Sequence, residues 1–105
     1  MKLPTKVKVG IFDYAIIAWG SNSANAQRRF GEFSVMENCI RIDVAAHQFK
    51  IVDTLIHEIN HAIFYVYKLE DADNEERICS TMASAWAAVY RDNPEILKWL
   101  TKYSK

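Results

Sequence analysis

The amino-acid sequence predicts strands in the first half of the chain and helices in the second, the element order of an α+β protein. Two stretches alternate apolar with polar side chains, at residues 5–12 and 39–44, which is typical of strands with one solvated face. Residues 49–67 instead repeat their apolar side chains at helical spacing. The length of 105 residues suits one domain, so we expect residues 1–105 to fold as a single unit.

Three stretches are predicted to be strands: residues 5–12, 30–35 and 39–44. Residues 36–38 form the turn of a hairpin between the last two. Residues 13–19 are apolar and either extend the first strand or form a packed loop. Residues 20–27 are rich in Ser, Asn and Ala and indicate a loop.

Three helices are predicted after the strands: residues 49–67, 75–92 and 94–103. Asn74 is a suitable N-cap for the second helix, and acidic residues in a first turn stabilise the helix dipole. Pro94 ends this helix, because the residue before a proline avoids helical geometry, and it can begin the third helix.

The first helix contains the sequence His57-Glu58-Ile59-Asn60-His61, which has the pattern H-E-x-x-H. Residues four apart lie on the same face of a helix, so both imidazoles can reach one metal ion. Zinc accepts imidazole nitrogen at about 2.0–2.1 Å. Glu58 lies about 100° further round the helix, beside the metal, where its carboxylate can act as a general base. The motif therefore predicts a zinc site with His57 and His61 as ligands and Glu58 as the catalytic residue.

A catalytic zinc site needs a third protein ligand, which the second helix can supply from Glu75 or Glu76. We prefer Glu76, because it lies at the centre of a face of small residues that would let two helices approach closely: Cys79, Ser80, Ala83 and Ala87. Ser80 would then support the metal site by a hydrogen bond, or simply pack as a small residue. The alternative is that both acids only stabilise the first turn of the helix.

Other polar residues near the motif carry weaker signals. His47 precedes the metal helix and either reaches the cleft or is solvated. Three tyrosines could polarise a substrate carbonyl or act as buried rings with a solvated hydroxyl: Tyr65, Tyr67 and Tyr90. Asp53 and Asp71 show no particular pattern.

The composition excludes two classes of partner. The formal net charge is zero, so there is no electrostatic case for nucleic-acid binding, which would need a basic face. No apolar run approaches the ~20 residues that span a bilayer, and the first residues lack the pattern of a signal peptide. Cys39 and Cys79 form no metal-type pair, and free thiols in a cytoplasmic protein are the simplest interpretation, with a disulfide as the alternative.

The metal motif resembles that of gluzincin-type zinc metallopeptidases, in which a downstream glutamate joins the two histidines. Residues 76–83, Glu-Arg-Ile-Cys-Ser-Thr-Met-Ala, resemble the E-x-x-A-N-x-F-A run of the ImmA/IrrE type, with Ser80 where that family has Asn or Asp. This alignment independently favours Glu76. Residues 54–67 and 75–94 also look like small phage- or prophage-encoded metallopeptidases, and the resemblance covers residues 30–95.

The resemblance implies a minimal zincin-like α+β fold, in which a small antiparallel sheet precedes the metal helix and the helix of Glu76 crosses beneath it. It implies a Zn²⁺-dependent endopeptidase acting on a protein substrate, such as a regulatory protein in a phage or mobile element. The strand at residues 39–44 would be the edge that binds the extended peptide. The alternatives are a zincin-fold binding module with a structural zinc, and a toxin-like or defence-related interaction protein without metal.

Overall fold

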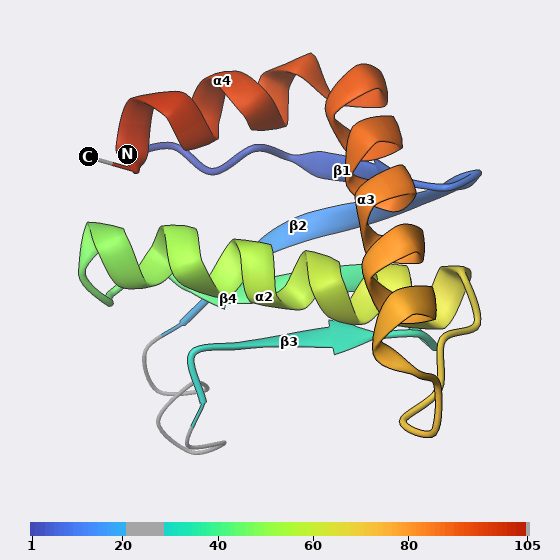
Figure 1. Cartoon of the computed structure of the whole chain (residues 1–105). Helices are drawn as coiled ribbons and strands as arrows, with labels where there is room; N and C mark the ends of the chain where they lie inside the picture. Colours follow the sequence, from blue (N-terminus) through green and yellow to red (C-terminus); the bar gives the residue numbers. More distant parts are fainter. Residues whose placement is uncertain (21–28, 105) are drawn as a thin grey trace.

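The computed structural model describes residues 1–20 and 29–104, and its first half forms a four-stranded sheet (Figure 1). The strands span Lys6–Val9 (β1), Phe12–Trp19 (β2), Gly31–Ser34 (β3) and Cys39–Asp43 (β4). Their order in the sheet is β1-β2-β4-β3. The predicted loop at residues 20–27 lies outside the described residues, apart from Gly20.

The predicted α+β class is confirmed, but the sheet is mixed rather than antiparallel. β4 runs parallel to β2 and antiparallel to β3, and β1 pairs antiparallel with β2. The prediction that residues 39–44 form an edge strand is therefore wrong, because β4 lies between β2 and β3. The interior position agrees with burial, since Ile40 and Ile42 have no exposed surface. The edge next to β4 is β3.

The predicted strand at residues 5–12 is confirmed at Lys6–Val9, but it ends earlier than predicted, because the chain turns at residues 10–11 and begins β2 at Phe12. β1 ends at Val9, and the chain turns at Gly10, whose φ of +63° favours glycine. β2 then includes residues 13–19, so this stretch extends the sheet and is not a packed loop. A Cβ atom at Gly10 would lie 2.8 Å from Val66 Cγ1, so the turn also needs a glycine for space.

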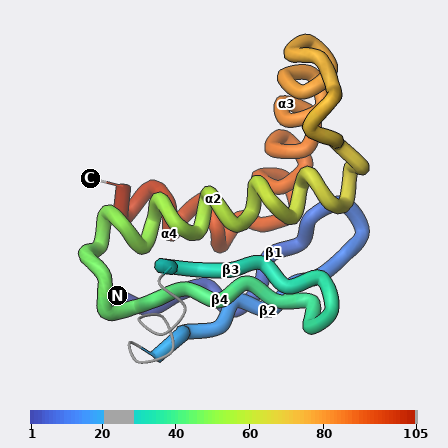
Figure 2. The backbone as a smooth tube through the Cα atoms, turned by 90° about the horizontal axis from the view of Figure 1, so that it is seen from below, coloured from blue at the N-terminus to red at the C-terminus, as the bar shows by residue number. Residues whose placement is uncertain are grey.

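Three helices complete the chain and lie on the same face of the sheet (Figure 2). They span Gln48–Val66 (α2), Glu75–Asp92 (α3) and Pro94–Tyr103 (α4), within one residue of the predicted bounds. Asn74 caps α3, since its side chain accepts a hydrogen bond of 2.8 Å from the Arg77 backbone. In the described part of the chain, no helix combines the length and apolar character needed to cross a membrane.

The core lies between this sheet face and α2. Alternate residues of the strands, such as Val7, Val9 and Ile40, pack against a stripe on α2 that includes Leu55, Ile59 and Ile63. These side chains have no exposed surface. Burial of this stripe fixes which face of α2 remains for other contacts.

Asn93 joins the corner between α3 and α4 to strand β1. Its side-chain Oδ1 accepts a hydrogen bond of 2.7 Å from the Lys8 backbone, and its Nδ2 donates one of 2.8 Å to the Lys8 carbonyl. Nδ2 also donates to the Val89 carbonyl at 2.8 Å. The amide therefore pairs with β1 as a neighbouring strand would, and it occupies this edge of the sheet at Lys8.

Helix α3 contacts the rest of the fold mainly through its second half. Ala85 and Val89 are its buried residues, and the helix contacts β1 and α4. Trp86 Nε1 donates a hydrogen bond of 2.9 Å to the Asn60 side chain on α2. Figure 2 shows that the first half of α3 extends away from the sheet.

Candidate metal centre

His57 and His61 lie one above the other on α2, as the i, i+4 spacing predicts. Their Nε2 atoms are 3.1 Å apart, and both side chains are exposed. Two nitrogens bound to one tetrahedral zinc at about 2.05 Å would lie about 3.3 Å apart. The separation thus suits two ligands of one ion, although it also suits a hydrogen bond between two imidazoles.

Glu58 completes a compact group with the two histidines. One potential ligand atom from each of His57, Glu58 and His61 lies within 4.8 Å of the others, which is close enough for all three to contact one metal ion. Glu58 is only 6% exposed, whereas both histidines are exposed. The carboxylate is therefore on the protein side of the group, and the imidazoles are on the solvent side.

Burial raises the pKa of Glu58 above its ordinary value. The nearby His57, His61 and Arg29 lower this pKa, and the negative charge of Glu32 raises it further, but desolvation is the largest effect. A carboxyl whose pKa is raised is a better proton acceptor when ionised than an exposed one. Perturbed groups of this kind in a cleft are typical of functional sites.

Gly31 on β3 makes room for this carboxylate, and sequence reasoning did not identify it. A Cβ atom there would lie 3.3 Å from Glu58 Oε2 and 2.6 Å from Thr54 Cγ2. It would also lie 2.8 Å from the Arg41 carbonyl oxygen. The sequence did contain a signal for this role, because Gly31 lies inside a predicted strand, and a glycine there often marks a place where another group approaches the backbone closely.

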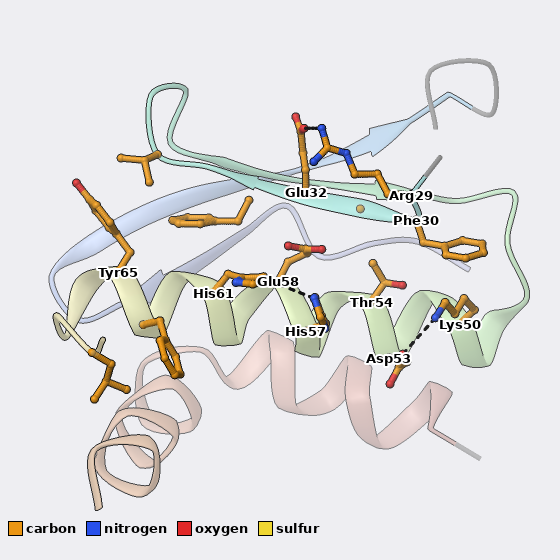
Figure 3. Close-up of a pocket in the computed structure, with 15 residues that line it drawn as sticks. Arg29, Phe30, Glu32, Lys50, Asp53, Thr54, His57, Glu58, His61 and Tyr65 are labelled. Atoms are coloured by element: carbon orange, nitrogen blue, oxygen red, sulfur yellow. Dashed lines mark hydrogen bonds and ion pairs between the residues drawn. The ribbon is translucent and has the colours of Figure 1, made fainter. Parts of the chain in front are cut away.

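A cleft of about 770 Å³ opens between β3 and α2 and contains the group (Figure 3). Figure 3 shows the Glu58 side chain pointing from α2 toward β3, with His57 and His61 beside it on the same helix. Tyr65 lies toward one end of the cleft, and Lys50 and Asp53 lie toward the other. The three residues His57, Glu58 and His61, the candidate metal-binding group, thus lie between the two ends of the cleft.

Glu76, the predicted third ligand, does not belong to this group among the described residues. Its side chain is exposed and accepts a hydrogen bond of 3.3 Å from Ser80 Oγ, and Glu75 is exposed as well. The expectation of close helix packing is wrong, because the small residues of that face are exposed: Cys79, Ser80, Ala83 and Ala87. The reason is that α3 packs through Ala85 and Val89 instead.

Some of the other polar residues considered from the sequence line the cleft and others do not. Tyr65 lines the cleft, whereas His47, Tyr67 and Tyr90 are not among its lining residues. Asp53 also lines it and pairs with Lys50 at 3.6 Å, although its sequence showed no particular pattern. Sequence reasoning did not identify the opposite wall, which β3 supplies.

Both cysteines are free, with Cys39 buried and Cys79 exposed. Comparison of the chain with protein-family models, with curated proteins and with solved structures found no match. The site is therefore described by its own geometry: two imidazoles and a buried carboxylate, close enough to bind a metal ion, in an open cleft.

Proposed function

We propose that this chain is a zinc-dependent endopeptidase that hydrolyses a peptide bond of a protein substrate in the cleft between β3 and α2. The observation that supports this most is the 3.1 Å separation of His57 Nε2 and His61 Nε2 beside the buried Glu58. Imidazole nitrogens are donors that zinc prefers, and two of them leave positions for a third ligand and a water molecule. The open cleft gives an extended substrate access to it.

In this proposal the histidines hold zinc and Glu58 moves protons. When bound, zinc would polarise the scissile carbonyl and promote ionisation of the attacking water. Glu58 would accept a proton from that water and deliver it to the leaving amine. The buried position of Glu58, which is 6% exposed, keeps its carboxylate on the protein side of the two histidines.

The third ligand stays a prediction from the sequence. Glu76 is supported by the resemblance of residues 76–83, but the first half of α3 would have to come closer to His57 and His61 than in the structure. Among the described residues, Glu58 is the acidic side chain grouped with the two histidines, and as a ligand it would be less available as a base. Substitutions of each acid distinguish these assignments.

The extended substrate would add to the outer side of β3, which pairs with no other strand among the described residues, rather than to residues 39–44. β3 is an outer strand of the sheet and also forms a wall of the cleft, so a peptide paired with it would pass the histidines. At the opposite outer strand, β1, the side chain of Asn93 already pairs with Lys8. The two edges therefore differ in their suitability for strand addition.

A regulatory protein of a phage or mobile element remains the proposed substrate, on the resemblance alone. The proposed site of action is the cytoplasm, where the free Cys39 and Cys79 would stay reduced.

The decisive experiment compares wild-type and Glu58→Gln chains, each loaded with zinc, in a proteomic screen for new peptide termini. Glu58→Gln keeps the size and polarity of the side chain but removes the base, so cleavage should fall by about 10²- to 10⁴-fold. Equal cleavage by both chains would show that Glu58 is not the base. Retained partner binding without cleavage by wild type would favour the binding module with a structural zinc.

A further inference from the structure

The two ends of the cleft differ in chemistry. Tyr65 lies at one end, where its ring centroid is 6.2 Å from that of Phe33. Three further apolar residues of the cleft lining are within four positions of Tyr65 or Phe33 in the sequence, and together these five side chains are called the apolar end of the cleft: Phe33, Val35, Phe64, Tyr65 and Leu69. The other end contains Phe30, Lys50 and Asp53, where Lys50 Nζ lies 4.8 Å from the Phe30 ring centroid and 3.6 Å from Asp53 Oδ2. Figure 3 shows Tyr65 and Lys50 on opposite sides of the metal-binding group.

In the apolar end of the cleft, the Phe33 ring packs against other aromatic rings, and Val35 and Tyr65 are exposed to solvent. The Phe33 ring contacts Tyr14 edge-on at a centroid distance of 5.2 Å, and Tyr65 at 6.2 Å. Leu69 is 8% exposed, whereas Val35 and Tyr65 are 39% and 53% exposed. A fixed aromatic wall with an exposed apolar rim, continuous with a polar site, is typical of a pocket for an apolar group.

The distance between the apolar end and the histidines determines which residue of a bound peptide could reach the apolar end. Tyr65 follows His61 by four residues, which is about 6 Å along the helix axis. An extended peptide advances about 3.3 Å per residue, so the apolar end lies within about two residues of a bond held at the histidines. Alternate side chains of a strand point to opposite faces, so only one of those two residues would face α2.

We infer that the cleft selects a peptide with a bulky aliphatic or aromatic side chain on one fixed side of the bond at the histidines. That side chain occupies the apolar end of the cleft, with Val35 and Tyr65 at its rim. The inference rests on the proposed function for the position of the cleaved bond, but the apolar binding itself needs no turnover.

The test is an NMR titration of the zinc-loaded Glu58→Gln chain with pentapeptides Gly-Gly-X-Gly-Gly, in which X is Leu, Phe, Gly, Asp or Lys. Partial burial of a Leu or Phe side chain should tighten binding by about tenfold relative to Gly. Asp and Lys should show no such gain, and shifts should map to β3 and the second half of α2. The titration is repeated without zinc, and the preference for Leu and Phe should persist, because the apolar end does not include the metal ligands.

Two variants locate the effect. Val35→Lys introduces a charge at an exposed rim position, so the chain should fold and the preference for Leu and Phe should disappear. Lys50→Glu, at the other end of the cleft, should retain that preference. Equal binding of Leu and Gly peptides, or an unchanged preference in Val35→Lys, would overturn the inference.

Cleavage profiling then separates this inference from the proposed function. If wild type cleaves proteins with no apolar preference on either side of the bond, the specificity is wrong and the peptidase stands. If wild type cleaves nothing while Leu and Phe peptides bind preferentially in the apolar end, the pocket stands and the peptidase is wrong.

Discussion

Gly31 on β3 and Glu58 on α2 approach so closely that a Cβ atom at Gly31 would lie 3.3 Å from Glu58 Oε2. The same atom would lie 2.6 Å from Thr54 Cγ2 and 2.8 Å from the Arg41 carbonyl oxygen. β3 and α2 thus approach each other closely where Gly31, Thr54 and Glu58 line the cleft. One glycine links the packing of the fold to the position of the carboxylate.

Gly31→Ala should destabilise the chain by about 1–3 kcal/mol, because the added methyl group forces β3 and α2 apart. Chemical denaturation measures this change. Gly20→Ala is the matched control, since a Cβ atom there meets nothing within 4 Å. It should change stability by no more than about 0.5 kcal/mol. Equal stability of both variants would show that the close approach has no energetic importance.

His61→Ala should abolish stoichiometric zinc binding, because it removes one of the two imidazoles whose Nε2 atoms are 3.1 Å apart. Metal analysis of chains purified without chelator measures this directly. His47→Ala is the control, since His47 does not line the cleft, and it should keep the wild-type content of zinc. Full zinc content in His61→Ala would contradict the metal assignment.

Glu76→Gln should weaken zinc binding by at least about tenfold, because the loss of even an outer-shell partner of a metal site costs about tenfold or more. Glu75→Gln should change the zinc affinity little. Competition with a chromogenic chelator measures both affinities. The reverse result would make Glu75 the ligand. No change in either variant would remove α3 from the metal site, in agreement with the exposed position of Glu76 in the structure.

The raised pKa of Glu58 predicts a pH-dependent stability in the presence of a chelator. The folded chain keeps the Glu58 proton to higher pH than the unfolded chain, whose glutamate pKa is about 4.3. The contribution of Glu58 to stability therefore falls as the pH rises from that value toward the raised pKa. Glu58→Gln lacks this titration, so its stability relative to wild type should increase as the pH rises through this window.

Denaturation curves across this pH range test the prediction. Asp53→Asn, an exposed substitution on the same helix, is the reference variant measured in parallel. A constant difference between Glu58→Gln and wild type would mean that burial does not perturb Glu58.

Asn93→Ala should cost about 1–3 kcal/mol, because it removes the side-chain partners of the Lys8 backbone N–H and carbonyl. Thermal or chemical denaturation measures the loss. Asn60→Ala removes a single hydrogen bond from Trp86 and should cost less. If Asn93→Ala were the milder of the two, the pairing of Asn93 with β1 would not be a main constraint on the α3–α4 corner.

Local sequence patterns were sufficient for most elements of this fold. Asn74 and Pro94 mark helix starts because capping and ring geometry act over a few residues. The spacing of His57 and His61 likewise determines that their imidazoles meet, since helix geometry alone places residues four apart together. Alternation in residues 39–44 correctly predicted a strand, for the same local reason.

The tertiary structure decided the features that depend on contacts between distant parts of the chain. Only strand pairing determines that β4 is interior and β3 forms the edge, because an alternating pattern does not specify which strand is the neighbour. Only helix packing determines that α3 buries Ala85 and Val89 and leaves Glu76 exposed, since helical periodicity allows either face of the helix to pack. The burial of Glu58 depends on both, because β3 must lie against α2 at Gly31, and this contact joins residues 27 positions apart.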